Sequence, residues 1–199
     1  MLEDAFLFAE KAHRGQMRKG TDIPYLIHLV RTWDYVKQMT DSMDEQAAAL
    51  LHDVLEDTPV TLRELKETFG DYIADLVKSE SEHKREERPA AETWKVRKME
   101  TLSRVHHLAQ CEGSEPYLHI TLGDKLANLY SMSYEYAQRG EELWKKFNQK
   151  DKGMHAWYYG ELGAIFQNYF TDGRAAVLVQ EYFQYYRSVF GQDGITKLT

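Results

Sequence analysis

The residues best suited to chemistry lie in the segment ALLHDVLEDT, residues 49–58. Apolar neighbours surround four polar residues there: His52, Asp53, Glu56 and Asp57. The pattern predicts a buried helix from about Asp44 to Asp57, on which His52, Asp53 and Glu56 share an arc of roughly 100°. Burying carboxylates without partners is costly, so this group requires a cation or a network of donors. Imidazole and carboxylate ligands suit divalent ions such as Mn²⁺, Fe²⁺ or Zn²⁺.

Two further candidate ligands come from other predicted helices. His28 lies between Leu26 and Val30, in an apolar stretch that should turn it inward. Asp124 lies on the side of its helix opposite a stripe of leucines. Taken alone, His28 suits a hydrogen-bonded core histidine and Asp124 suits a solvent-facing polar stripe. Together with His52-Asp53 they offer two imidazoles and two carboxylates from three helices, which is a ligand set for one divalent ion.

The elements that must hold these residues are helices. The sequence has 4 prolines in 199 residues and few alternating runs, which predicts an all-α fold. We expect a single domain over residues 1–199, a bundle of about eight to ten helices. The core motifs occupy residues 12–131, and an aromatic-rich helical part occupies residues 140–199. The expected helices include about Glu3 to Arg14, one starting at Pro24, Thr61 to Gly70, Ala91 to Gln110 and Pro116 to Gln138.

The composition narrows the class of protein. A formal net charge of −7 argues against a general nucleic-acid binder, which normally has a basic face. No apolar run approaches the ~20 residues of a membrane span, and the acidic Glu3 and Asp4 stand where a secretory signal would be basic. Cys111 is the only cysteine, which excludes an intrachain disulfide. We therefore expect a cytoplasmic protein with a small-molecule partner, and neither nucleic acid nor membrane. The oligomeric state stays open.

Four blocks of sequence resemble one branch of the HD superfamily. They are AHRGQMRKGTDIPYLIH (12–28), ALLHDVLEDT (49–58), TLRELKETFGDYIADLV (61–77) and GDKLANLYSM (123–132). In residue types and order they resemble the hydrolase domain of RelA/SpoT alarmone enzymes and the stand-alone small alarmone hydrolases of the metazoan SpoT homologue type. The resemblance covers roughly residues 3 to 135. It implies an all-α HD-type (p)ppGpp hydrolase, which removes a 3′-pyrophosphate.

The resemblance also implies a role for each matching residue. The metal ligands would be His28, His52, Asp53 and Asp124, with Mn²⁺ as the usual ion. Glu56 and Asp57 would position or activate the attacking water and transfer protons. The nucleotide would be bound by Arg18, Lys19, Tyr25, Asn128 and Ser131. The chemistry is consistent, because a divalent ion activates water and neutralises phosphoryl charge, and Lys and Arg bind phosphate oxygens.

Several positions depart from the pattern of the family, and two of them flank the metal and nucleotide positions. Lys125 stands where the family has Arg, and Ala127 stands where it has His. The exact substrate therefore stays open between (p)ppGpp, (p)ppApp and another nucleotide, such as NADPH acted on by a 2′-phosphatase. A rival of another class is an HD module that senses a nucleotide without turning it over. The intact set of ligands and the pair Glu56-Asp57 favour the enzyme.

Overall fold

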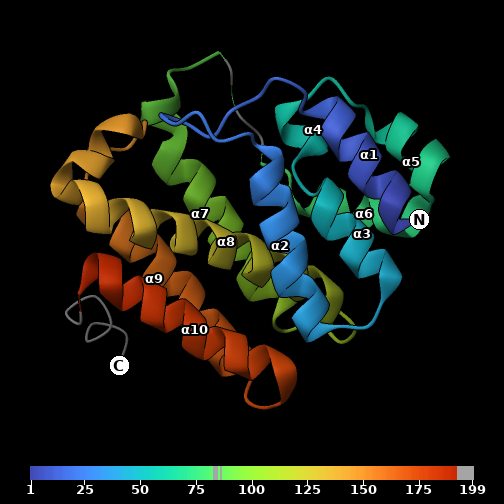
Figure 1. Cartoon of the computed structure of the whole chain (residues 1–199). Coiled ribbons are helices and arrows are strands. Elements are labelled where there is room, and N and C mark those ends of the chain that lie inside the picture. The colour runs from blue at the N-terminus through green and yellow to red at the C-terminus, as the bar shows by residue number, and fades with distance from the viewer. Residues whose placement is uncertain (83–84, 86, 192–199) are drawn as a thin grey trace. The chain divides into compact units, whose positions relative to one another are not determined.

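The computed structural model describes residues 1–82, 85 and 87–191, and all regular elements within them are helical (Figure 1). This confirms the predicted all-α fold. The α-helices are α1 (Leu2–Ala12), α2 (Leu26–Met39), α3 (Met43–Leu51), α4 (Val54–Asp57), α5 (Leu62–Phe69), α6 (Asp71–Glu80), α7 (Ala90–Leu108), α8 (Glu115–Arg139), α9 (Lys152–Tyr169) and α10 (Gly173–Phe190). A 3-10 helix, η1, covers Gly140–Lys146. Across the described residues, no helix has the length and apolar character that a membrane span requires.

The chain divides into two compact units. The first comprises Met1–His83 and Gly113–Ala127, and the second comprises Lys84–Glu112 and Asn128–Thr199. Helix α8 begins in the first unit and continues into the second. The single domain expected over residues 1–199 stays a prediction. The aromatic-rich part expected over residues 140–199 is helical as far as it is described, and residues 192–199 lie outside the described residues.

Helix α3 lies at the centre of the first unit. It contacts α1, α2 and α6, and its residues Ala47 to Leu51 are 0–3% exposed. Ala5 and Ala9 of α1 are fully buried, and small side chains of this kind let two helices approach closely. Each large apolar side chain buried in this core stabilises the fold by about 1.5–3 kcal/mol. The end of α3 is thereby fixed, and His52 follows directly.

The predicted helix over residues 44–57 is wrong in one respect, because it is interrupted at His52 and Asp53. Helix α3 ends at Leu51 and α4 begins at Val54. The Nδ1 atom of His52 lies 2.8 Å from the carbonyl oxygen of Ala49. In a continuous helix that carbonyl would accept the N–H of Asp53. The imidazole of His52 thus competes for the helical acceptor, and His52 and Asp53 occupy a turn rather than one helical arc.

The start of α8 packs into the first unit by polar and close apolar contacts. His119 bonds to Glu45 of α3, and Thr121 bonds to Glu80 of α6. At Gly123 an added Cβ would lie 2.7 Å from the side chain of Val36 on α2, so glycine permits the close approach of the two helices. These contacts fix the helical turn that carries Asp124.

The second unit has an aromatic core. Tyr182 and Tyr186 of α10 are fully buried, together with Phe166 of α9. The hydroxyl of Tyr182 donates to the carbonyl of Tyr159, and that of Tyr186 donates to the carbonyl of Ala156. These aromatic residues pack α9 against α10.

Candidate metal centre and active site

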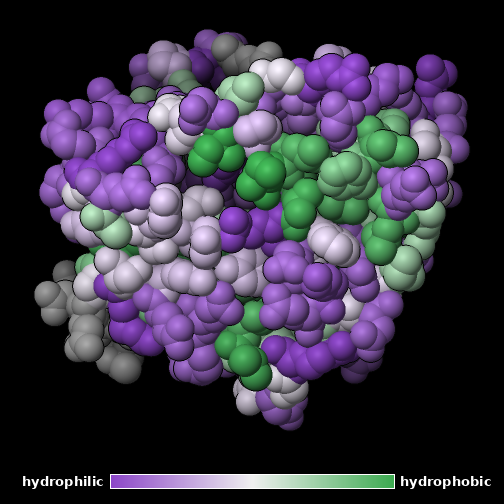
Figure 2. Space-filling model, viewed as in Figure 1, coloured by the Kyte–Doolittle hydropathy of each residue, from purple (hydrophilic) through white to green (hydrophobic). Residues whose placement is uncertain are grey.

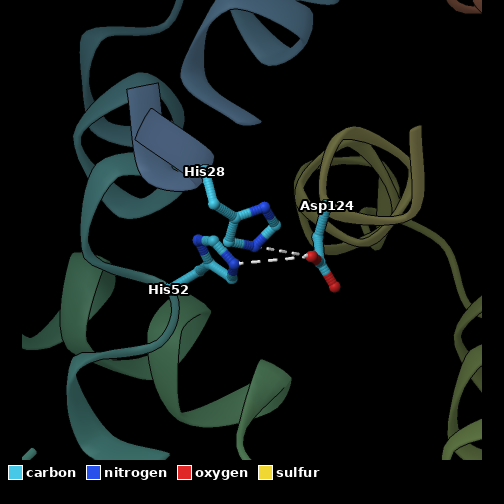
Figure 3. A group of neighbouring side chains, drawn as sticks. All are labelled: His28, His52 and Asp124. Atoms are coloured by element: carbon cyan, nitrogen blue, oxygen red, sulfur yellow. Dashed lines mark ion pairs between the residues drawn. The ribbon is translucent and has the colours of Figure 1, made fainter. Parts of the chain in front are cut away.

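Three buried side chains from α2, from the turn after α3 and from α8 converge in the first unit (Figure 3). The Nε2 atoms of His28 and His52 lie 3.1 Å and 3.6 Å from Oδ1 of Asp124. Their candidate ligand atoms all lie within 4.8 Å of one another. The Oδ2 atom of Asp53 is also close, at 3.4 Å from Nε2 of His28 and 3.0 Å from Nε2 of His52. The four predicted ligands therefore lie together.

The burial of His28 is not a result of general apolar packing on α2. Its neighbour Ile27 is 47% exposed, whereas His28 is 4% exposed. Figure 2 shows exposed apolar side chains where α1 and α2 of the first unit lie in the same view. Helix α2 thus exposes an isoleucine and buries a histidine, and the buried imidazole needs a hydrogen-bond or ionic partner. Asp53 and Asp124 supply that partner, and the solvent-facing alternative for Asp124 is wrong because its side chain is 9% exposed.

The donor set fits a divalent metal ion. The Nδ1 atom of His52 is within hydrogen-bond distance of the Ala49 carbonyl, which assigns the N–H to Nδ1 and leaves a lone pair on Nε2. That buried Nε2 makes no well-aligned hydrogen bond with the described residues, although two carboxylates lie near it. Imidazole nitrogen and carboxylate oxygen are ligands of divalent transition metals. The cluster is thus a candidate site for such an ion.

Electrostatics bind the four residues together. Burial disfavours the charged form of His52, but Asp53 and Asp124 outweigh it and raise the pKa of His52 well above its usual value. Burial likewise opposes the charge on Asp53, yet His52 and His28 hold the pKa of Asp53 well below its usual value. At Asp124 burial again opposes the charge, but Lys125 and the two histidines together outweigh it and hold the pKa of Asp124 well below its usual value. Both carboxylates are therefore ionised at neutral pH, as metal ligands must be, and a metal ion bound to Nε2 of His52 would take the place of the proton that the acids otherwise favour there.

A basic loop extends this site. The N–H of Arg18 donates to the carbonyl of Ile23, and the N–H of Tyr25 donates to the carbonyl of Gln16, so the loop folds back on itself. The Arg18 guanidinium carbon then lies 5.4 Å from the centre of the Tyr25 ring. The hydroxyl of Tyr25 donates to Oδ2 of Asp53 at 2.7 Å. Tyr25 therefore connects the basic loop with the candidate ligand Asp53.

The carboxylate of Glu56 lies on α4, directly after the ligand turn. Its Oε2 atom accepts the backbone N–H of Glu82 at 3.1 Å. Burial and, after it, the charge of Asp53 raise the pKa of Glu56 to about 7, while the Glu82 N–H opposes that shift. Asp57 is half-buried on the same helical turn. A carboxyl group that titrates near neutral pH beside candidate metal ligands is suited to proton transfer.

Not all predicted site residues lie in the first unit. The first unit holds Arg18, Lys19, Tyr25, His28, His52, Asp53, Glu56, Asp57 and Asp124. Asn128 and Ser131 lie on the part of α8 that belongs to the second unit. Their proposed role in binding the nucleotide stays a prediction, and so does the role of each of the other residues.

Two groups near the site were not expected from the sequence. His13 stacks on Tyr25 with ring centres 5.1 Å apart, and its Nδ1 lies 2.7 Å from Oε1 of Gln16. Both residues stand in the AHRGQ motif, which could have drawn attention to them. The other group is the N–H of Glu82, which binds Glu56 from 26 residues away. A backbone donor leaves no signature in residue types, so no sequence signal could have found it.

The chain belongs to a known family. A family model described as "HD domain" matches residues 5–154, a span that includes every proposed site residue. This confirms the family assignment that the sequence motifs suggested.

Curated relatives match a part of the chain. The bifunctional (p)ppGpp synthase/hydrolase SpoT of Escherichia coli K12 is 40% identical over 80 residues, which are 40% of this chain and 11% of that protein. The guanosine-3′,5′-bis(diphosphate) 3′-pyrophosphohydrolase of Spiroplasma citri is 32% identical over 141 residues, or 69% of this chain and 18% of that protein. The chain therefore matches less than a fifth of either relative's length.

Two solved structures share the fold. A crystal structure of a Listeria monocytogenes EGD-e protein has a TM-score of 0.68 and 26% identity, and covers 87% of this chain and 99% of its own. A metazoan ortholog of SpoT that hydrolyses ppGpp has a TM-score of 0.67 and 20% identity, with 92% and 93% covered. At this identity the second likeness concerns the fold alone.

Proposed function

We propose that this chain is a metal-dependent phosphohydrolase that removes the 3′-pyrophosphate from a (p)ppGpp-type nucleotide in the cytoplasm. One observation supports the proposal: His28, His52 and Asp124 are buried and lie together with Asp53 as candidate ligands, and Glu56, whose pKa is raised to about 7, follows on α4. Membership of the HD family and relatives named as (p)ppGpp 3′-pyrophosphohydrolases support the choice of reaction and substrate.

The ion that we assign to this ligand set is Mn²⁺. His28, His52, Asp53 and Asp124 would hold it, and two nitrogen with two oxygen donors suit a divalent transition metal. When bound, the ion supplies Lewis-acid chemistry, which activates water at neutral pH and neutralises phosphoryl charge. Tyr25 holds Asp53 in place through its 2.7 Å hydrogen bond, as outer-shell partners of metal ligands commonly do.

The protein's own acid–base groups are Glu56 and Asp57. Glu56 is poised near neutral pH, so its carboxylate can take a proton from the attacking water and return it to the leaving oxygen. The N–H of Glu82 fixes one carboxylate oxygen, which leaves the other to orient the water. Asp57, one residue further on α4, supplies a second carboxylate for orienting the water.

The phosphates and the nucleoside have separate binding groups in this proposal. Arg18 and Lys19 bind phosphate oxygens with charge-assisted hydrogen bonds, and Tyr25 offers the nucleotide an aromatic ring beside Arg18. Asn128 and Ser131 bind the sugar and phosphate region. The ion pair between Lys125 and Asp124 places a cation beside a ligand, so Lys125 is suited to binding the phosphoryl group next to the metal.

The test is a substrate panel with purified protein. We expect Mn²⁺-dependent release of pyrophosphate from ppGpp or pppGpp, with weaker turnover of ppApp, NADPH and simple nucleotides. Products are identified by chromatography and mass. Asp124→Asn should abolish turnover, and Asp34→Asn, at an exposed carboxylate on α2, is the matched control that should not. Preferred turnover of NADPH or ppApp would reassign the substrate, and nucleotide binding without any turnover would identify a sensing module.

A further inference from the structure

A second polar network lies beside the candidate ligands in the first unit. Thr121 of α8 donates its hydroxyl to Oε1 of Glu80 at 2.6 Å. Thr121 is fully buried and Glu80 is 8% exposed, so little water competes for this bond. A hydrogen bond from a hydroxyl to a buried carboxylate is stronger than a bond between neutral groups. The bond therefore fixes the end of α6, whose last residue is Glu80, on α8.

The chain after α6 connects this anchor with Glu56. The N–H of Ser81 donates to the carbonyl of Lys78 at 3.2 Å, which closes a turn at the end of the helix. The next N–H, that of Glu82, donates to Oε2 of Glu56 at 3.1 Å. Residues 80–82 are thus held on α8 at one end and bind the carboxylate of Glu56 at the other.

The other side of this connection leads to a candidate metal ligand. Thr121 and Asp124 are three residues apart on α8, so they lie on the same side of the helix. We propose that the Thr121–Glu80 hydrogen bond is a positioning device of the active site, which sets the spacing between the carboxylates of Glu56 and Asp124. Thr121 and Glu80 are positioning residues: they act through Glu82 and touch neither metal nor substrate. This inference rests on the roles proposed above for Glu56 and Asp124.

The alternative is that the bond only stabilises the core, and the same unit contains a pair that separates the two roles. Thr40, at the end of α2, donates its hydroxyl to Oε1 of Glu45 at 3.1 Å, and Oε2 of Glu45 lies 2.8 Å from Nδ1 of His119. Thr40 and Glu45 are also buried. This pair joins α2, α3 and α8, and it does not include the segment 80–82, whose Glu82 N–H binds Glu56. A purely structural role therefore predicts equal effects at Thr121 and Thr40.

The experiment compares Thr121→Val with Thr40→Val, because each removes a hydroxyl that donates to a buried glutamate. We measure Tm, Mn²⁺ affinity, kcat, KM and the pH profile of kcat. We expect both variants to lower Tm similarly, and only Thr121→Val to lower kcat, by about 10- to 100-fold. The pH profile of its kcat should shift to higher pH, because a loosened Glu82 N–H lowers the pKa of Glu56 less. Burial and the charges of Asp53, Asp57 and the Glu82 carboxylate still raise that pKa. Thr121→Ser should restore activity.

Equal kcat and equal pH profiles in the two valine variants would overturn the inference. If Thr121→Val does not fold, Glu80→Gln weakens the same bond with little change in shape and takes its place. If the wild type hydrolyses no nucleotide, the proposed function fails, but the inference is still decided by a carbon NMR titration of the Glu56 carboxyl. A Glu56 pKa that is raised in Thr121→Val but not in Thr40→Val supports the inference. An unchanged Glu56 pKa in Thr121→Val contradicts it.

Discussion

Both units contain buried histidines, and His52 of the first unit and His155 of the second have opposite surroundings. His52 in the first unit lies beside Asp53 and Asp124, which raise its pKa against the effect of burial. His155 in the second unit lies against Trp94 and Trp144, with ring centres 5.3 and 5.2 Å away. Burial lowers the pKa of His155, and its Nε2 lies 2.9 Å from the carbonyl of Gln149. Burial alone gives a neutral packing group, whereas burial beside acids gives a candidate ligand.

The same contrast extends to the other buried polar groups. In the second unit the hydroxyls of Tyr182 and Tyr186 each donate to a backbone carbonyl, so the need of each hydroxyl for a partner is met locally. In the first unit, buried carboxylates of Glu45, Glu80 and Asp124 bind side chains of other helices. Carboxyl groups are costly to bury without partners, so each of these side chains depends on a residue of another helix.

The largest expected effect is on bound metal and turnover, and it comes from replacing His52 and, for comparison, His155. His52→Phe should lose both bound metal and turnover, to below detection, because a ligand nitrogen is removed. His155→Phe keeps an aromatic ring among the tryptophans, so metal and turnover should persist. Its free energy of unfolding should fall by about 1–3 kcal/mol, since the Gln149 carbonyl loses its partner. Elemental analysis, kcat and Tm on the same preparations decide it. A metal-loaded, active His52→Phe would remove this cluster from the chemistry.

The next effect distinguishes carboxylates that act on water from those that hold the core. Glu56→Gln and Asp57→Asn keep the shape of each side chain, and kcat should fall by about 10²–10⁴ with bound metal and nucleotide affinity near wild type. Glu45→Gln changes a buried carboxylate of the same unit that bonds only within the core, and it should affect Tm alone. Near-normal kcat in both Glu56→Gln and Asp57→Asn would exclude the pair from the mechanism.

A smaller effect concerns the basic loop, where affinity should change and the metal should not. Charge-assisted hydrogen bonds to phosphate contribute about 1.5–3 kcal/mol each, so Arg18→Ala with Lys19→Ala should raise KM at least tenfold. Bound metal should be unchanged, because neither residue is one of the four candidate ligands, and Tyr25 connects Arg18 with the candidate ligand Asp53. Lys11→Ala, on the exposed side of α1, is the matched control. If KM and kcat of the double variant equal those of wild type, the nucleotide binds elsewhere.

The sequence predicted the all-α fold and the residues that converge at the site, because local patterns carry both. Apolar residues around His52 predicted its burial, which is confirmed, and His28 is also buried as predicted, although its apolar neighbour Ile27 is exposed. The break at His52 and Asp53 escaped prediction, since it depends on where an imidazole bonds to the backbone. The Thr121–Glu80 bond spans 41 residues, and helical periodicity holds no information about such pairs. Local pattern thus predicts which residues are buried, and tertiary packing decides what each one touches.

The smallest expected effect concerns the stability of the metal-free protein. Burial raises the pKa of Glu56 from 4.5, its ordinary value, to about 7. Because the folded state holds this proton more tightly than the unfolded state, Glu56 makes stability decrease as pH rises from about 4.5 to about 7, with no further loss above that range.

Glu56→Gln removes the titration and still offers an oxygen to the N–H of Glu82. The free energy of unfolding of the variant, relative to wild type, should therefore rise by about 1 kcal/mol as the pH is raised from 5 to 8. This figure allows for water at the half-buried group. Chemical denaturation in excess chelator measures the difference at each pH, and Glu67→Gln, at an exposed side chain of α5, is the control. If the difference in the free energy of unfolding between Glu56→Gln and wild type does not change with pH, Glu56 is charged in the folded protein throughout this range. Glu56 would then be a fixed anion rather than a proton carrier.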